Sequence, residues 1–168
     1  MDANMLMEVS GICQHCAGKV KVLMLNGEAI DACGGCGENP FVSRMVKGLV
    51  YIVSNPNQKG VKVGLTTKSM EDRLRSLNST GVPGDFVPIA IFPSERPRAD
   101  EERVHEKLRK YNLAKEHFDL DPVEAVLKAY RALNKRTPIF FDSSLQETFY
   151  LKLEEARIAM QLRLRGAS

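Results

Sequence analysis

The chain has 168 residues, of which 43% are hydrophobic and 27% charged, and its formal net charge at pH 7 is +3. This composition is typical of globular proteins, and the weakly basic balance permits nucleic-acid binding without requiring it. No apolar run approaches the roughly 20 residues that cross a bilayer, and the first residues lack the pattern of a secretory signal, so we expect a cytoplasmic protein without structural disulfides.

Four cysteines form two Cys-x2-Cys pairs, Cys13 with Cys16 and Cys33 with Cys36, and sixteen residues separate the pairs. This spacing lets two tight turns direct four thiolates at one point. Four thiolates close a tetrahedral shell, which predicts a structural rather than a catalytic Zn²⁺ ion. A redox pair and two turns with free thiols are the alternatives.

The segment between the cysteine pairs predicts a β-hairpin, because two short apolar runs flank Asn26-Gly27. Residues 8–40 therefore resemble a zinc ribbon. His15 lies between two expected ligands and is either an exposed turn residue or a substitute ligand. A stretch with Gly37, Pro40 and little periodicity follows and is expected to be a linker.

The elements after the linker begin with strands at 49–53 and 61–65 and a helix that opens near Ser69. A third strand is expected in FVPIAIF, a helix in RADEERVHEKLRKY, a short strand in EHF, and a helix from Asp121 through about Leu133. This order predicts an α+β fold with a mostly antiparallel three-stranded sheet flanked by helices.

The last segment predicts a helix that opens with a capping box at Ser144-Leu145-Gln146-Glu147. It carries an apolar stripe at helical spacing, formed by Leu145, Phe149, Leu153, Ala156, Met160 and Leu164. Such a stripe is a packing face or a face for a homodimer. The expected domains are thus a ribbon with linker at 1–46, a central domain at 47–135 and a C-terminal amphipathic helix at 136–168.

The central domain carries a set of polar residues at the spacing Tyr-x10-Lys-x-Gly-x8-Arg, followed later by Glu-x3-His. Its members are Tyr51, Lys62, Gly64, Arg73, Glu101 and His105. The set resembles the GIY-YIG nuclease superfamily, with GLVYIV as the first half-motif and VKVG as the second. Lysine in place of the second tyrosine is similar to a divergent branch from phages and bacteria, and the resemblance covers residues 48–130.

The resemblance implies a DNA endonuclease that hydrolyses phosphodiester bonds with Mg²⁺ or Mn²⁺. It implies that Tyr51 is the general base, that Glu101 binds the catalytic ion and that Arg73 stabilises charge on the phosphate. Lys62 would support Tyr51 electrostatically. His105 shares a helix face with Glu101 and is an ion ligand, a phosphate contact or a proton donor. The family's late asparagine has its nearest match in Asn112.

A tyrosine base is a demanding choice, because a phenol has a pKa of about 10 and its ionisation at pH 7 costs roughly 4 kcal/mol. Neighbouring cations lower that cost. Two rival hypotheses need no catalysis: a DNA-binding module that keeps the fold, and an interaction protein that assembles a complex through the ribbon and the tail helix.

Overall fold

The structure is a computed structural model that describes residues 5–42, 46–79, 81 and 83–166. It divides into two compact units with separate sheets, unit 1 (Met1–Met45) and unit 2 (Val46–Ser168). Part of the expected linker, residues 43–45, lies outside the described residues. Within the described ranges, no helix is both long enough and apolar enough to span a bilayer.

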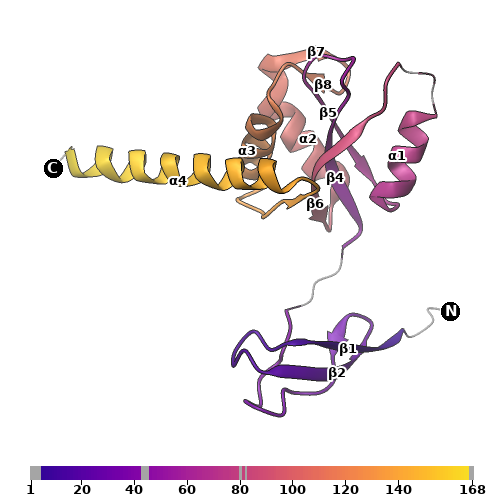
Figure 1. Cartoon of the computed structure of the whole chain (residues 1–168), viewed down its shortest axis with the longest axis vertical. Coiled ribbons are helices and arrows are strands. Elements are labelled where there is room, and N and C mark those ends of the chain that lie inside the picture. The colour runs from indigo at the N-terminus through magenta and orange to yellow at the C-terminus, as the bar shows by residue number, and fades with distance from the viewer. Residues whose placement is uncertain (1–4, 43–45, 80, 82, 167–168) are drawn as a thin grey trace. The chain divides into compact units, whose positions relative to one another are not determined.

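Unit 1 is a three-stranded antiparallel sheet in the order β1-β2-β3 (Figure 1). The strands are β1 (Leu6–Ile12), β2 (Lys19–Leu25) and β3 (Glu28–Ala29). Asn26 and Gly27 join β2 to β3 with φ angles of 53° and 90°, as a type I′ turn requires, so the predicted hairpin is confirmed. Strand β1 has no counterpart among the predicted elements, because most of its residues are exposed and its sequence LMEVSGI opens with two consecutive apolar residues.

Unit 2 is built on a six-stranded antiparallel sheet in the order β7-β8-β5-β4-β6-β9. The three expected strands form its centre: β4 (Gly48–Ser54), β5 (Val61–Thr66) and β6 (Val87–Ser94). Three short strands widen it: β7 (Asn112–Ala114), β8 (His117–Phe118) and β9 (Ile139–Phe140). The predicted α+β class and antiparallel sheet are confirmed, and β8 confirms the short strand expected in EHF. The sheet is wider than expected because β7 and β9, with three and two residues, are too short to show a pattern in the sequence.

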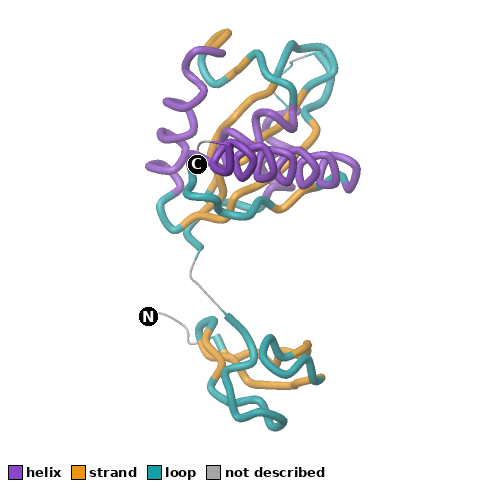
Figure 2. The backbone as a smooth tube through the Cα atoms, turned by 90° about the vertical axis from the view of Figure 1, so that its left-hand side faces the viewer, coloured by secondary structure: helices purple, strands orange, loops and turns teal. Residues whose placement is uncertain are grey.

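Helices cover both faces of this sheet (Figures 1 and 2). They are α1 (Met70–Asn78), α2 (Pro97–Leu108) and α3 (Pro122–Ala132), and the short 3-10 helix η1 (Arg109–Tyr111) follows α2. The side chains of Ser69 and Asp121 accept hydrogen bonds from the first turns of α1 and α3, which confirms both predicted helix starts.

The two faces of the sheet bury separate apolar clusters. The larger one joins the sheet to α2 and α3 and includes Val50, Ile52, Val63, Phe92, Val104, Leu108, Val126 and Leu133. The smaller one lies under α1 and consists of Tyr51, Val53, Met70, Leu77 and Phe86. Since side chains alternate along a strand, neighbouring residues of β4 belong to different clusters.

The C-terminal helix α4 (Ser143–Gly166) begins two residues earlier than a capping box with Ser144 as its N-cap would place it. Its cap is Asp142, whose Oδ1 accepts hydrogen bonds from the backbone N–H groups of Ser144, at 2.8 Å, and Leu145, at 3.0 Å. The capping-box prediction is therefore wrong: Ser144 already lies inside the first turn, and an aspartate caps this end equally well.

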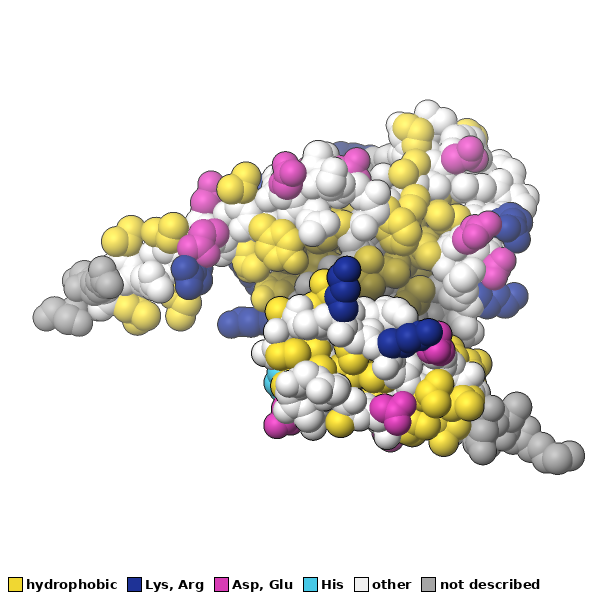
Figure 3. All heavy atoms as spheres, turned by 60° about the horizontal axis from the view of Figure 1, so that its bottom comes forward, with side chains coloured by type: hydrophobic (Ala, Val, Ile, Leu, Met, Phe, Trp, Pro, Cys, Tyr) yellow, Lys and Arg dark blue, Asp and Glu magenta, His cyan; other side chains and the backbone are white. Residues whose placement is uncertain are grey.

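The apolar stripe of α4 is divided between two environments. Leu145, Phe149 and Leu153 pack on the larger cluster, where Phe149 is fully buried against the ring of Phe140, with ring centroids 5.2 Å apart. From residue 154 to residue 164 every side chain is exposed. Figure 3 shows apolar side chains on both sides of this projecting end. The stripe is therefore a packing face only in its first half.

Candidate active site and candidate metal centre

The two cysteine pairs of unit 1 lie in loops with the same backbone hydrogen bonds. In the first loop, the N–H of Cys13 donates to Gly18 O at 2.9 Å and that of Ala17 donates to Cys13 O at 3.0 Å. In the second, Cys33 donates to Glu38 O at 2.9 Å and Gly37 to Cys33 O at 2.7 Å. Both loops therefore hold a Cys-x2-Cys pair in one turn geometry.

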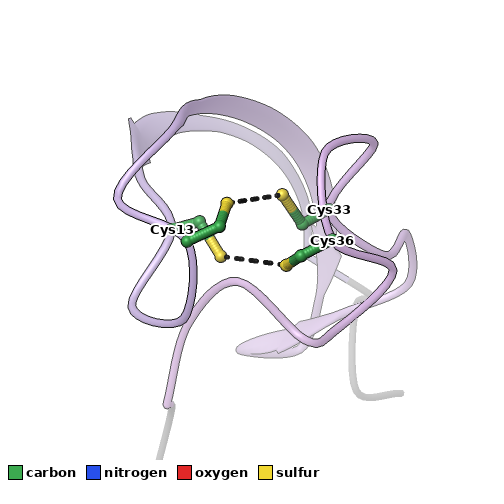
Figure 4. Close-up of side chains that lie close together, drawn as sticks. Cys13, Cys33 and Cys36 are labelled. Atoms are coloured by element: carbon green, nitrogen blue, oxygen red, sulfur yellow. Dashed lines mark hydrogen bonds between the residues drawn. The ribbon is translucent and has the colours of Figure 1, made fainter.

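The sulfurs of these two loops point toward one another (Figure 4). All four Sγ atoms lie within 4.8 Å of each other, with 3.7 Å between Cys13 and Cys36 and 3.8 Å between Cys16 and Cys33. Zn–S bonds of about 2.3 Å in a regular tetrahedron place sulfurs about 3.8 Å apart. The cysteine cluster therefore fits a structural Zn²⁺ ion. In a redox Cys-x2-Cys pair the two close sulfurs belong to the same motif, whereas here each close contact joins one motif to the other.

The chemistry of the cluster also suits a cation. Hydrogen bonds from the backbone N–H groups of Gly35 and Cys36 lower the pKa of Cys33 to about 7. A hydrogen bond from the Glu38 backbone lowers the pKa of Cys36. Burial and the crowded neighbouring thiols outweigh this effect and raise the pKa of Cys36 to about 12. Four thiolates at these distances need a positive charge between them. The exposed His15 is not needed to complete the set.

In unit 2, the register of β4 and β5 places Tyr51 opposite Gly64. The ring of Tyr51 lies so close over Gly64 that a Cβ atom there would be 2.4 Å from the hydroxyl and 2.6 Å from Cζ. Tyr51 is 0% exposed because α1 covers this face of the sheet. Glycine in the second half-motif is therefore required by the position of the phenol.

Arg73 reaches Tyr51 from α1. Its Nε donates a 3.0 Å hydrogen bond to the Tyr51 hydroxyl, and its guanidinium carbon lies 5.5 Å from the ring centroid. Burial raises the pKa of Tyr51; the hydrogen bond and the charge of Arg73 act in the opposite direction. The cation acting on the phenol is thus an arginine whose position is set by α1.

Glu101 and His105 lie along the outer edge of β5. Strand β8 pairs with β5 only at Val61 and Lys62, so the backbone groups beyond them need other partners. His105 Nε2 lies 3.1 Å from Val63 O, and since a carbonyl only accepts, Nε2 donates. Glu101 accepts a hydrogen bond from the backbone N–H of Leu65. Glu101 and His105 are four residues apart on α2, so both side chains lie on one helix face and reach backbone groups two residues apart on β5.

The surroundings of Glu101 make the charged form of its carboxyl group unfavourable. Burial raises its pKa, and the negative charge of Glu116 raises it further, while His105 and Lys62 act against this. A bound cation relieves such a carboxylate, so Glu101 fits the oxygen ligand that Mg²⁺ or Mn²⁺ prefers. Among the described residues only the four cysteines form a group of three or more close ligands. An ion at Glu101 would therefore complete its shell with water and phosphate oxygens.

Glu116 lies beside the predicted site residues and was not among them. Its carboxylate forms an ion pair with the ammonium group of Lys62 and accepts a hydrogen bond from it. Burial raises the pKa of Glu116, but the hydrogen bond and the charge of Lys62 outweigh burial, so the pKa is lowered overall. Its neighbour His117 pairs with Lys62 across the strands, and its buried Nε2 has no hydrogen-bond partner within the described part of the chain. The EHF sequence was the available signal: it indicated a short strand and contributed to the family resemblance, but Glu116 itself was not selected.

A buried acid beside Glu101 fixes α2. Asp100 is 5% exposed and accepts hydrogen bonds from Ser94 Oγ, at 2.6 Å, and from the guanidinium of Arg136. Burial raises the pKa of Asp100, but these two partners outweigh burial and lower the pKa overall, so the carboxylate stays ionised. The network ties the first turn of α2 to the end of β6, which sets the position of Glu101.

The five predicted site residues thus come from four elements, β4, β5, α1 and α2. Tyr51 contacts Arg73, and the charges of Lys62 and His105 both act on Glu101. Asn112 is not part of this set. Its amide donates to Lys115 O at 2.8 Å and holds the turn between β7 and β8.

Removal of zinc tests the cysteine cluster. We expect about one zinc ion per chain by atomic absorption, and we expect a strong chelator to unfold unit 1 while unit 2 keeps its amide NMR signals. Cys33→Ser should lose the metal and His15→Ala should keep it. Full zinc binding by Cys33→Ser would contradict the four-cysteine site.

Substitution of Gly64 tests the packing of Tyr51. Gly64→Ala should displace the ring and destabilise unit 2 by about 1–3 kcal/mol, measured by urea unfolding, because the added methyl group overpacks the site. Gly34→Ala is the control, since its added Cβ meets nothing within 4 Å. Equal stability of the Gly64→Ala and natural proteins would show that the ring is free to move aside.

Comparison with known proteins is consistent with this geometry. The family model of the T5orf172 domain matches residues 48–134, which is more than half of the chain and contains all five predicted site residues of unit 2. No curated protein and no solved structure matches the chain. T5orf172 domains are nuclease-like, which implies DNA as the substrate class. The chain therefore belongs to the T5orf172 domain family.

Proposed function

We propose that this protein is a metal-dependent DNA endonuclease of GIY-YIG type. The observation that carries the proposal is the 3.0 Å hydrogen bond between Arg73 Nε and the Tyr51 hydroxyl, on the sheet whose edge is lined by Glu101. Phosphodiester hydrolysis needs a base, a charge at the phosphate and help for the leaving oxygen. A phenol, a guanidinium and a carboxylate suited to a divalent ion supply these parts.

Glu101 is the proposed ligand of a Mg²⁺ or Mn²⁺ ion, which supplies charge neutralisation at the phosphate when it is bound. Its hydrogen bond from the Leu65 backbone fixes one side of the carboxylate. The half-buried position keeps the other side near solvent. His105 already donates Nε2–H to Val63 O, so Nδ1 is the nitrogen that remains for an ion or a phosphate.

Arg73 is proposed to connect the base with the phosphate. Its Nε binds the Tyr51 hydroxyl, and within the described residues its two terminal nitrogens have no hydrogen-bond partner. These nitrogens suit two oxygens of one phosphate because the guanidinium fork is planar. The same side chain then stabilises the phenolate and the charge that develops on the phosphate.

The burial of Tyr51 favours a second candidate, a DNA-binding module without catalysis. The phenol is 0% exposed, and burial raises its pKa, so ionisation at pH 7 costs more than the roughly 4 kcal/mol of a free phenol. A phenol in this position is catalytic only if substrate and ion compensate this cost. The two candidates share the fold and DNA as partner, and they differ in cleavage.

Cleavage of DNA separates these candidates. Supercoiled and branched DNA should be cut with Mg²⁺ or Mn²⁺, and Glu101→Gln should reduce the rate by about 100-fold or more through loss of the ion. Tyr51→Phe keeps the ring on Gly64 and should cost about 100-fold through loss of the base. The exposed neighbour Glu102→Gln is the control. Binding without cleavage by the natural protein would favour the non-catalytic module.

The projecting end of α4 supports the homodimer that we also propose, and this assembly role is compatible with nuclease activity. The side chains of residues 154–163 are all exposed, and a solvent-exposed helical segment of this length is only marginally stable in water. Glu154 and Glu155 lie at its inner end and Arg163 lies toward its outer end. An antiparallel second copy brings these opposite charges together while covering Met160.

Light scattering tests the homodimer. The molar mass should be twice the 18.7 kDa of one chain, and Met160→Glu should reduce it to one chain because a charge then faces the apolar seam. Gln161→Glu, which adds the same charge about 100° around the helix from Met160, is the matched control. A natural protein that stays monomeric at high concentration would contradict the proposal.

A further inference from the structure

Lys62 has an unusual position for a lysine on a strand. Its side chain is only 12% exposed, and its ammonium meets the carboxylate of Glu116, whose side chain is 42% exposed. A lysine side chain is flexible, and a nearly buried ammonium is unfavourable without an anionic partner. The location of the Lys62 charge therefore depends on where Glu116 is held.

The backbone holds Glu116 firmly at this place. Its carbonyl accepts a 3.0 Å hydrogen bond from the N–H of Val63, the residue next to Lys62 on β5. The preceding residue, Lys115, has a left-handed φ of 49°, and the amide of Asn112 donates to its carbonyl at 2.8 Å. A clamped turn thus presents the Glu116 carboxylate to β5 from outside the sheet.

The charge of Glu116 acts on the rest of the site. It raises the pKa of both Tyr51 and Glu101, while Arg73 and His105 act on Glu116 itself. Pairing with Lys62 balances this charge. Removal of either partner leaves one uncompensated charge among the proposed catalytic groups, which is more harmful than loss of both.

We propose that Glu116 is a positioning residue of the nuclease site, which fixes the Lys62 ammonium near Glu101 through the ion pair and the clamped turn. The proposal rests on the proposed function for its catalytic consequence, and on the contacts of Lys62 alone for its structural part. Glu116 acts through Lys62 and needs no contact with DNA.

Chemical labelling of lysines tests the structural part without any activity. The full-length protein is acetylated with an amine-reactive reagent, and the rate at each lysine is measured by mass spectrometry. Glu116→Gln keeps the side-chain volume and should raise the rate at Lys62 by roughly tenfold, the factor for a loss of about 1.4 kcal/mol. Lys59, whose side chain is 73% exposed, is the internal reference.

A matched pair elsewhere in unit 2 provides the control. Lys152 and Glu124 form an ion pair at 3.0 Å with side chains 38% and 41% exposed. Glu124→Gln should leave the labelling of Lys62 and the cleavage of DNA unchanged. An unchanged rate at Lys62 in Glu116→Gln would overturn the proposal.

Cleavage kinetics test the catalytic part. Glu116→Gln and Lys62→Gln should each lower kcat more than they change KM, and the double variant should be no slower than Lys62→Gln alone. Additive losses would show that Glu116 does not act through Lys62. If the natural protein cuts no DNA, the proposed function fails, and labelling alone then decides whether Glu116 fixes Lys62.

Discussion

The arrangement of the site depends on one close contact across two strands, the ring of Tyr51 on the bare backbone of Gly64. Any side chain on that residue of β5 would occupy the space of the phenol. With the phenol end of the ring at Gly64, its hydroxyl meets Arg73 of α1, and α1 covers the small apolar cluster beneath it. At this point the packing of the sheet and the geometry of the site impose the same constraint. A substitution of Gly64 would therefore change both the stability of unit 2 and the position of the Tyr51 hydroxyl.

The second constraint is the incomplete pairing of β5. Backbone groups at the edge of a sheet need partners, and β8 is too short to supply them beyond Lys62. The His105 side chain and the backbone of Glu116 take over at Val63. A requirement of the fold thus collects two carboxylates, an imidazole and an ammonium at one edge, which is the edge proposed above to bind a cation and a phosphate.

The sequence predicts the parts of the fold that have strong local signals. Short apolar runs bounded by turn residues identify the three central strands, and Ser69 and Asp121 identify two helix starts. The burial of Tyr51 depends on α1 folding over it, which no local pattern encodes. Glu116 was missed because a two-residue strand positions it, and its partner lies 54 residues away in the chain. The cap of α4 was misplaced because Asp142 and Ser144 are both good capping residues.

The central claim is that the edge of β5 forms a cation site in which Glu101 is the protein ligand. A crystal structure grown with Mn²⁺, with anomalous diffraction data, tests it most directly. The account predicts an anomalous peak near the Glu101 carboxylate, with Mn–O distances of about 2.0–2.6 Å and remaining positions filled by water. A structure with Mn²⁺ bound elsewhere in unit 2, or with Glu101 bound only to the Leu65 backbone at saturating Mn²⁺, would contradict it.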